Sequence, residues 1–360
     1  VFMEKYKILI IDDSALMRSV MSDIISKDNR FVIADKAVDG MQGLDLLIKT
    51  NGKYDLVLLD VNMPKMNGLE VLKKVRKYNL KCKVIMVSTL VKEGATETIL
   101  ALENGAIDFV LKPSNTRGEM LEDFEKRLME SIFIAVGLTN NKGRENHRII
   151  DTKNKISSSY PKDGEKIIAI ACSTGGPKSL KEVIPLLPEN IDATIILVQH
   201  MPAGFTKSLS DRLNELSKVT VSEAAEGDIL KKGHVYIAPG GKQMRIVHEV
   251  GNVHSIKITD EAPREGLKPC ANIMYESLID SKYDNIICVV LTGMGSDGTN
   301  GIEKLTKNKQ VYVISQDAKT SVVYGMPRAV TNAGLADEIS ALDKMSQAII
   351  KNVGVLSNGR

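Results

Sequence analysis

The stretches Lys7-Ile-Leu-Ile-Ile-Asp-Asp13 and Ile167-Ile-Ala-Ile-Ala-Cys-Ser173 are the most informative in the chain, because each is a short apolar run that ends in a reactive side chain. Runs of this kind, rich in β-branched residues, indicate buried parallel strands. The same pattern recurs along the chain. Further apolar runs end at Asp60, Ser88, Lys112, His200 and a glycine-rich turn that contains Asp297. The acidic endings fall in the first third, so the two halves are expected to carry different chemistry.

The bulk composition is that of an ordinary globular protein. A chain of 360 residues exceeds one ordinary core and favours two domains. The net charge of +3, from 48 basic and 45 acidic residues, gives no reason to expect nucleic acid as a partner. No apolar run approaches the roughly 20 residues that span a bilayer, so we expect no direct membrane insertion. The four cysteines form no Cys-x-x-Cys pair, which favours a reduced, cytoplasmic chain.

Apolar runs alternate with amphipathic helical segments in both halves of the chain. Residues 6–112 alternate in this way, with one helical stripe at Leu16, Val20, Ile24 and Ile25, which predicts a doubly wound parallel sheet. After a helical pattern near residues 119–135, apolar periodicity disappears between residues 139 and 166, as in a polar linker. The alternation then resumes and predicts a second α/β sheet.

These patterns place a first domain at residues 5–122, a helix and interdomain linker at 123–164, and a second domain at 165–352. One segment breaks the alternation, because residues 243–248 and 254–258 flank a short polar turn typical of a β-hairpin. His248 and His254 fall on opposite arms of this hairpin. We expect both to face solvent and to form no zinc site.

The strand ends of the first domain predict a site for phosphate chemistry. The carboxyl ends of strands in a doubly wound sheet open into one crevice. Adjacent carboxylates repel one another unless a hard cation such as Mg²⁺ neutralises them, and a clamped phosphodonor can then be attacked by a carboxylate. Asp60 is the best nucleophile, because it ends the central strand. The residues expected to converge are Asp12, Asp13, Asp60, Ser88 and Lys112. For any one of these aspartates alone an ordinary solubilising role is the commoner explanation, but the whole spaced set favours the phosphate site.

The first domain resembles the receiver domain of response regulators in the motifs Asp12-Asp13, Asp60-Val-Asn-Met-Pro-Lys-Met-Asn-Gly68, Ser88 and Asp108-Phe-Val-Leu-Lys-Pro113. The resemblance implies a flavodoxin-like fold, Mg²⁺ held by Asp12, Asp13 and Asp60, and phosphorylation of Asp60 by a histidine kinase. It also implies that Ser88 and Phe109 read the signal and that Lys112 and Ser88 hold phosphoryl oxygens, although Phe109 fits a plain core role equally well. Arg18 and Lys36 are expected to be ordinary solvated charges.

The second half contains the parts of a serine hydrolase. Ser173-Thr-Gly-Gly-Pro177 follows a strand directly and opens a helical segment, so Ser173 is expected beside free backbone N–H groups that favour negative charge. A serine hydroxyl needs a base, and His200 ends the next strand. Asp297, in the turn Thr292-Gly-Met-Gly-Ser-Asp-Gly298, is the candidate that orients the histidine.

Several alternatives compete with this hypothesis. A serine in such a loop can simply cap a helix, a lone histidine is more often structural, and an aspartate among glycines suits a turn. Cys172 is a second candidate nucleophile, but strand alternation points it away from Ser173 and favours a small buried role. A dinucleotide site is disfavoured because Gly175-Gly176-Pro177 is not Gly-x-Gly-x-x-Gly. A DNA-binding output is disfavoured because the second half is rich in strands.

The second half resembles the catalytic domain of chemotaxis protein-glutamate methylesterases, the CheB family. The motifs are Ala171-Cys-Ser-Thr-Gly-Gly-Pro177, Val198-Gln-His-Met-Pro202, Val235-Tyr-Ile-Ala-Pro-Gly-Gly241, Leu291-Thr-Gly-Met-Gly-Ser-Asp-Gly298 and Gln316-Asp-Ala-Lys-Thr-Ser-Val-Val-Tyr-Gly-Met-Pro-Arg328. With the receiver motifs, the likeness covers nearly the whole chain except the linker. It implies a Rossmann-like domain with Ser173 as nucleophile, His200 as general base and Asp297 as its partner. The Met294 backbone N–H and Thr174 are implied at the oxyanion site.

The same resemblance implies a phosphorylation-regulated enzyme that hydrolyses glutamate methyl esters on methyl-accepting chemoreceptors, releases methanol and deamidates receptor glutamines. Mg²⁺ is implied for the receiver domain and no cofactor for the esterase step. The domain order and the polar linker suggest that the unphosphorylated receiver domain covers the rim that carries Ser173, and that phosphorylation of Asp60 relieves this inhibition. The competing class is a receiver joined to a non-catalytic receptor-binding module whose triad has decayed.

Overall fold

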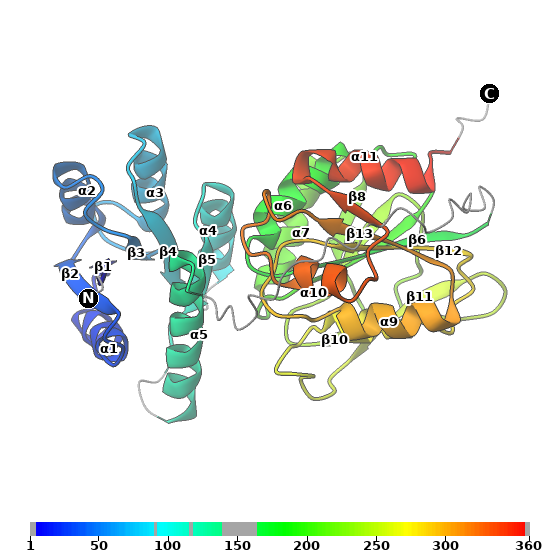
Figure 1. Ribbon diagram of the computed structural model, residues 1–360, viewed down its shortest axis with the longest axis horizontal. Helices are drawn as coiled ribbons and strands as arrows, with labels where there is room; N and C mark the ends of the chain where they lie inside the picture. The colour runs from blue at the N-terminus through cyan, green and yellow to red at the C-terminus, as the bar shows by residue number, and fades with distance from the viewer. Residues whose placement is uncertain (1–4, 90–91, 115–117, 139–163, 357–360) are drawn as a thin grey trace. The chain divides into compact units, whose positions relative to one another are not determined.

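The computed structural model describes residues 5–89, 92–114, 118–138 and 164–356 (Figure 1). The chain divides into two compact units after residue 146. Most of the predicted polar linker, residues 139–163, lies outside the described residues. Each unit is therefore described by itself.

The first unit is a five-stranded parallel sheet with the strand order β2-β1-β3-β4-β5. Its strands are β1 (Tyr6–Ile11), β2 (Phe31–Ala37), β3 (Leu56–Asp60), β4 (Lys83–Ser88) and β5 (Asp108–Leu111). Its helices are α1 (Ala15–Ser26), α2 (Gly40–Lys49), α3 (Gly68–Lys77), α4 (Lys92–Glu103) and α5 (Glu119–Val136). This is the flavodoxin-like order, and it confirms the predicted doubly wound sheet.

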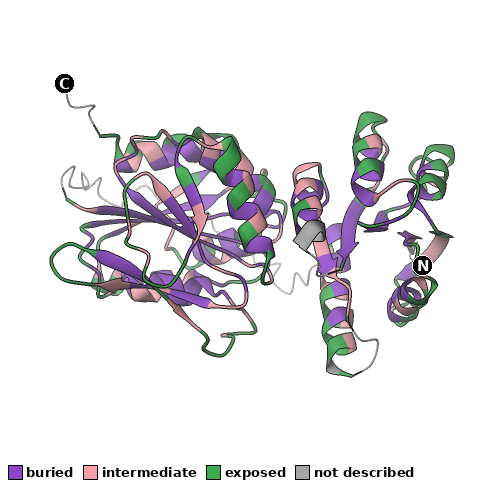
Figure 2. Cartoon of the chain, turned by 180° about the vertical axis from the view of Figure 1, so that it is seen from behind, coloured by how far each residue is buried: buried purple, intermediate pink, exposed green. Residues whose placement is uncertain are grey.

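The core of the first unit lies between the sheet and the helices α1 and α5, and its strands are buried (Figure 2). Phe124, Leu128 and Ile132 of α5 belong to this core, so α5 packs with the first sheet. The predicted stripe on α1 was partly wrong, because Leu16 is 59% exposed and Met17 faces the core instead. The Ser14 hydroxyl caps α1 by accepting from Met17 N, which sets where the helix begins and hence which face meets the sheet.

The second unit is a seven-stranded sheet with the order β14-β13-β12-β6-β7-β9-β8, in which every pairing is parallel. Its strands are β6 (Lys166–Cys172), β7 (Thr194–Gln199), β8 (Thr220–Glu223), β9 (His234–Ile237), β12 (Asn285–Val290), β13 (Val311–Gln316) and β14 (Glu338–Ser340). Its α-helices are α6 (Gly176–Val183), α7 (Phe205–Leu216), α8 (Ala271–Ser277), α9 (Thr299–Asn308), α10 (Met326–Asn332) and α11 (Leu342–Val353), and a 3₁₀ turn, η1 (Ile184–Leu186), follows α6. The predicted Rossmann-like α/β fold is confirmed.

Helices cover both faces of the second sheet (Figure 1). The helices α6, α7 and α11 pack on one face, and α8, α9 and α10 pack on the other together with a hairpin. The hairpin consists of β10 (Gln243–His248) and β11 (His254–Thr259), which pair in antiparallel register as predicted. Because the sheet is parallel, the carboxyl ends of β6, β7 and β12 share one edge.

One expectation about the hairpin was wrong. His254 is buried rather than solvated, because the hairpin packs against the body of the unit. Its ring stacks on Tyr283 with 4.2 Å between centroids, and its Nε2 accepts from the backbone N–H of Lys282. Burial is the main reason why the pKa of His254 is lowered. This histidine therefore has a structural role.

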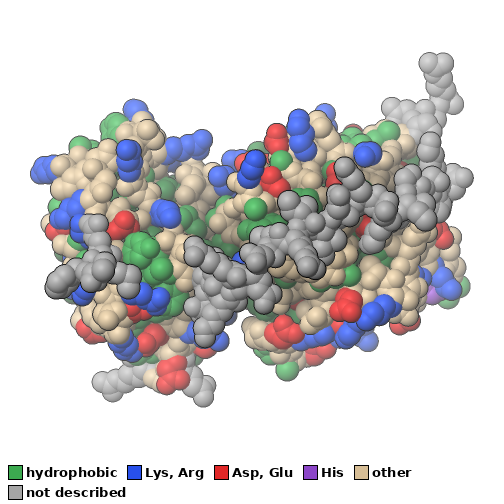
Figure 3. Space-filling model, in the orientation of Figure 1, with side chains coloured by type: hydrophobic (Ala, Val, Ile, Leu, Met, Phe, Trp, Pro, Cys, Tyr) green, Lys and Arg blue, Asp and Glu red, His purple; other side chains and the backbone are tan. Residues whose placement is uncertain are grey.

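The surface carries no large field of one charge on the face shown in Figure 3, where basic and acidic side chains are intermixed over both units. Within the described ranges, no helix is long and apolar enough to cross a membrane.

Candidate active site

The acidic residues of the first unit meet at the carboxyl edge of its sheet. Carboxylate oxygens of Asp12, Asp13 and Asp60 all lie within 4.8 Å of one another. The Nζ of Lys112 lies 2.9 Å from Asp12 Oδ2 and 2.7 Å from Asp60 Oδ2. One ammonium group cannot balance three carboxylates, so the cluster is compatible with a hard divalent cation such as Mg²⁺.

The carboxyl group of Asp60 has a raised pKa. Burial raises its pKa to about 6, although the nearby ammonium group of Lys112 opposes this rise. The pKa of Lys112 is itself raised, because the attraction of Asp60 and Asp12 outweighs the effect of burial. Lys112 therefore remains an ammonium group that can hold an anionic phosphoryl group beside Asp60.

The predicted switch residues lie on β4, which pairs with the strand of Asp60, and on β5, which pairs with β4. Ser88 ends β4, is fully buried and donates from Oγ to the carbonyl of Thr89 at 3.2 Å. Phe109 lies on β5 opposite Met86 and is half-buried. Ser88 therefore lies at the carboxyl end of the strand beside Asp60, and Phe109 lies one strand further along the sheet.

Arg18 is not the solvated charge that was expected. Its Nη1 donates to the carbonyl oxygens of Asp12 at 2.7 Å and Asp13 at 2.9 Å. The guanidinium group therefore anchors the loop that carries two of the three acidic residues. Lys36 is exposed, as expected.

Ser173 and His200 are brought together by the register of β6 and β7. Cys172 pairs with Gln199, so Ser173 and His200 are the next residues on two neighbouring strands. The His200 backbone N–H donates to the Cys172 carbonyl at 3.1 Å. Neighbouring strands lie about 4.8 Å apart, which places the serine and the histidine side by side on one rim.

Asp297 completes the set, with its Oδ2 2.8 Å from His200 Nε2. Asp297 is buried, and its carboxylate faces the first turn of α8. Its other donors are the backbone N–H groups of Ala271 (2.6 Å), Asn272 (2.9 Å) and Gly298 (2.9 Å), and the thiol of Cys270 (3.2 Å). Burial alone would raise the pKa of Asp297, but the bonds from His200, Ala271 and Asn272 hold it below the ordinary value. Asp297 is therefore an ionised, rigidly held acceptor for the imidazole ring.

The hydrogen bond to Asp297 decides which nitrogen of the histidine ring is protonated. Asp297 fixes Nε2 as the nitrogen that carries a proton. The remaining nitrogen, Nδ1, is then left as a hydrogen-bond acceptor on the ring. Asp297 would also stabilise the imidazolium ion that forms.

The loop after β12 lies directly against the serine. A Cβ added to Gly293 would lie 2.8 Å from the Cβ of Ser173, so only glycine allows this approach. The Gly293 N–H donates to the carbonyl of Val323 at 3.0 Å. The next residue, Met294, has a backbone N–H with no protein acceptor among the residues that the structure describes. An unengaged N–H beside a nucleophile is what an oxyanion site requires.

Cys172 does not compete with Ser173. The thiol is fully buried, and burial raises its pKa far above the ordinary value. It donates to Gln199 Oε1 at 3.0 Å. A buried neutral thiol is a poor nucleophile, in agreement with the expected structural role.

Two supports of this site were not found from the sequence. The buried amide of Gln199 donates from Nε2 to the carbonyls of Ser173 (3.0 Å) and His200 (3.1 Å), so it ties the two catalytic turns together. The thiol of Cys270 and the first turn of α8 hold Asp297. Gln199 lies in the motif Val198-Gln-His-Met-Pro202, and its position directly before His200 was the only sign in the sequence that it could support the site.

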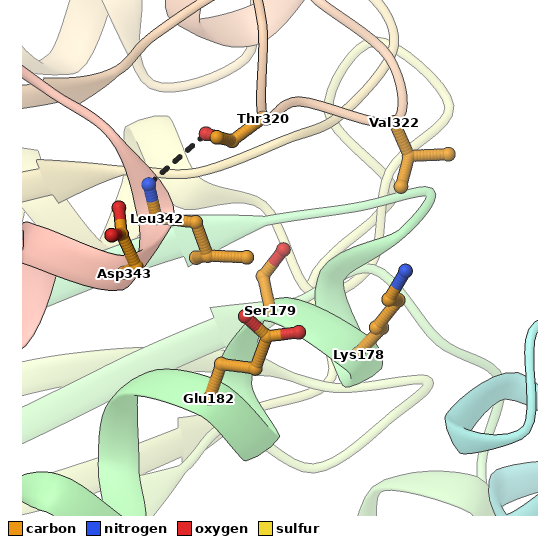
Figure 4. Close-up of a pocket in the computed structure, with 7 residues that line it drawn as sticks. All are labelled: Lys178, Ser179, Glu182, Thr320, Val322, Leu342 and Asp343. Carbon is orange, nitrogen blue, oxygen red and sulfur yellow. Dashed lines mark hydrogen bonds between the residues drawn. The ribbon is translucent and has the colours of Figure 1, made fainter.

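A pocket of about 220 Å³ lies beside the serine turn (Figure 4). Its lining residues are Lys178, Ser179, Glu182, Thr320, Val322, Leu342 and Asp343. The Thr320 hydroxyl accepts from the Leu342 backbone N–H at 3.0 Å and closes one wall. Val322 borders both this pocket and the serine turn, because a Cβ on Gly175 would lie 2.6 Å from Val322 Cβ. The pocket therefore borders the turn after Ser173, and its lining includes none of Ser173, His200 and Asp297.

Comparisons with known proteins agree with this geometry. The family model described as CheB methylesterase matches residues 168–349, and the response regulator receiver domain matches residues 8–125. A protein-glutamate methylesterase/protein-glutamine glutaminase of Oceanobacillus iheyensis is 39% identical over 98% of this chain and 100% of its own length. A protein of the same description from Pyrococcus horikoshii is 38% identical over 99% of this chain and 95% of its own length.

A solved structure gives the same result for the second unit. The crystal structure of the Thermotoga maritima CheB methylesterase catalytic domain is 39% identical, covers 52% of this chain and 99% of that chain, and has a TM-score of 0.51. The matched residues include the rim that carries Ser173, His200 and Asp297. The chain therefore belongs to the CheB methylesterase family and carries a response-regulator receiver domain at its N-terminal side.

Proposed function

We propose that this chain is a phosphorylation-regulated protein-glutamate methylesterase and protein-glutamine glutaminase of chemotaxis. Its substrates are methyl-accepting chemoreceptors, and the receiver domain is phosphorylated by a histidine kinase. The observation that carries the proposal is the hydrogen bond between His200 and Asp297, on the rim where Ser173 follows the neighbouring strand. Family membership supports the same reaction.

The proposed reaction is an acyl transfer through Ser173. The serine Oγ attacks the Cδ carbonyl of a methylated glutamate while His200 Nδ1 takes the hydroxyl proton. The Met294 N–H and Thr174 hold the oxyanion, and His200 returns the proton to the leaving methanol. Water then attacks the acyl-enzyme and restores the serine. A receptor glutamine follows the same route with ammonia as leaving group, and no cofactor takes part.

The receiver chemistry centres on Asp60. Asp12, Asp13 and Asp60 would hold Mg²⁺, which supplies charge neutralisation for phosphoryl transfer. Asp60 accepts the phosphoryl group, Lys112 and Ser88 bind its oxygens, and Phe109 responds to the occupied site. In this proposal residues 5–122 form the receiver domain, 123–164 a helix and linker, and 165–352 the catalytic domain. Four cysteines without a disulfide suit a cytoplasmic enzyme.

Mg²⁺ binding should weaken at acid pH because a proton competes for Asp60. With a pKa of about 6, the carboxyl is mostly ionised at pH 7 and mostly protonated at pH 5. The affinity of the full chain for Mg²⁺ should then be about tenfold weaker at pH 5 than at pH 7. Isothermal titration calorimetry with Mg²⁺ at both pH values measures this difference in affinity. Asp60→Asn should bind Mg²⁺ weakly at both, and equal wild-type affinities would contradict the assignment.

Phosphorylation should raise esterase activity by relieving inhibition from the receiver domain. A coupling free energy of ordinary size between phosphorylation and esterase activity corresponds to an increase of about 5–150-fold in methanol release from methylated receptor membranes. The test adds a small-molecule phosphodonor and Mg²⁺ to the full chain, with Asp60→Asn as the unresponsive control. Residues 150–360 alone should match the activated rate. Equal rates for this fragment and the unphosphorylated full chain would remove the inhibition proposal, and no methanol release from any form would remove the esterase proposal.

A further inference from the structure

Thr292 is a fully buried polar residue that none of the proposed catalytic steps uses. It follows β12 and immediately precedes Gly293 and Met294. Its carbonyl accepts from the Ser173 N–H at 3.0 Å, and its own N–H donates to Gln316 Oε1 at 2.8 Å. The backbone of Thr292 therefore already links the serine turn to the end of β13.

The side-chain hydroxyl of Thr292 joins two further segments. It donates to the Thr174 carbonyl at 2.9 Å, with the Val323 carbonyl at 3.2 Å as a second acceptor. It also accepts from the Val323 N–H at 2.9 Å. A hydroxyl has one hydrogen and two acceptor lone pairs, so this group is well satisfied where it is. We call residues 320–325, which precede α10, the covering loop, because Val322 packs against Gly175 of the serine turn and Val323 bonds to Thr292.

These contacts connect the serine turn with the loop that carries the proposed oxyanion donor. Thr174 directly follows Ser173, and Met294 is two residues beyond Thr292. The segment that follows the covering loop also contacts the end of β12, because the Gly293 carbonyl accepts from the Met326 N–H at 2.8 Å. A Cβ on Gly325 would lie 2.6 Å from Gly293 O, which shows how closely the two loops pack. Movement of Thr292 would therefore shift Met294 relative to Ser173.

We infer that the Thr292 hydroxyl is a positioning group for the esterase reaction, which holds the serine turn and the Met294 N–H at the separation that the tetrahedral intermediate requires. The inference rests on the proposed function. Oxyanion donors lower the barrier only when they are held in place before the charge develops. A misplacement of about 1 Å can cost about 10²-fold in rate.

The test replaces Thr292 in the full chain, activated with phosphodonor and Mg²⁺. Thr292→Val keeps the shape and removes the hydroxyl, so it should lower kcat about 10–10²-fold while KM changes less than about twofold. Thr292→Ser retains the hydroxyl and should keep kcat within about threefold of wild type. Phosphorylation of Asp60 should be unchanged in both. Thr292→Cys, with a weak thiol donor, should give an intermediate kcat and serves if the valine variant does not fold.

A matched control separates positioning from simple stabilisation. Thr331 in α10 also donates its hydroxyl to a backbone carbonyl, that of Pro327, at 2.9 Å. Thr331→Val should lower the Tm but leave kcat at the wild-type value. A wild-type kcat in folded Thr292→Val or Thr292→Cys, or a serine variant as impaired as the valine variant, would overturn the inference alone. A wild-type chain that releases no methanol would overturn the proposed function and the inference with it.

Discussion

Replacement of Ser173 by alanine is expected to lower methanol release from methylated receptors by about 10⁴–10⁶-fold, because the attacking oxygen is removed. The backbone of Ser173 should keep its place, since it donates to the Thr292 carbonyl and accepts from Gln199. Phosphorylation of Asp60 should remain at the wild-type level, because that reaction takes place in the other unit. Steady-state methanol release and phosphodonor-dependent labelling of Asp60 measure the two results.

The neighbouring cysteine provides the matched control for this variant. Cys172→Ser changes a buried thiol that donates to Gln199 into a hydroxyl of similar shape. Its turnover should stay within about tenfold of wild type, because the group takes no part in bond making. An active Ser173→Ala together with an inactive Cys172→Ser would show that the nucleophile has been assigned to the wrong residue.

Replacement of Asp297 by asparagine is expected to lower kcat by about 10³–10⁴-fold. One of the two acceptor oxygens would become an N–H₂ donor, and an N–H₂ group that faces His200 would favour the unproductive tautomer of the imidazole. The stability should fall as well, since the new amide must direct its N–H₂ group at donors on α8 or at His200. Measurements of kcat and of Tm by calorimetry give the two effects separately.

A second aspartate tests whether this effect is specific. Asp228 also accepts from a backbone N–H, that of Ala225, but lies outside the triad. Asp228→Asn should therefore retain wild-type kcat. If Asp297→Asn also retained wild-type kcat, the hydrogen bond to His200 would have no part in the reaction.

The arrangement of the site could be predicted from the sequence because the ends of parallel strands lie at one edge of the sheet. Short apolar runs showed where strands end, and parallel pairing places those ends on one edge. The meeting of Asp12, Asp60 and Lys112 followed from this rule, as did the neighbouring positions of Ser173 and His200. No distance between side chains was needed for either prediction.

The supports of the site could not be predicted, because they depend on side-chain contacts between segments far apart in the chain. Asp297 is held by Cys270 and the first turn of α8, and no periodicity connects these segments. Arg18 lies where a surface helix faces water, yet its guanidinium group reaches back to the loop of Asp12. His254 alternates correctly for a hairpin, but alternation does not say which face meets the rest of the fold.

A crystal structure of the catalytic unit, residues 165–352, would give the distance between Ser173 Oγ and His200 Nδ1, on which the acyl-transfer proposal depends. We expect the two atoms to lie within hydrogen-bond reach, about 2.6–3.2 Å or slightly longer without substrate, while Nε2 bonds to Asp297. A ring turned so that neither nitrogen can approach the serine oxygen, with Asp297 bonded elsewhere, would contradict it.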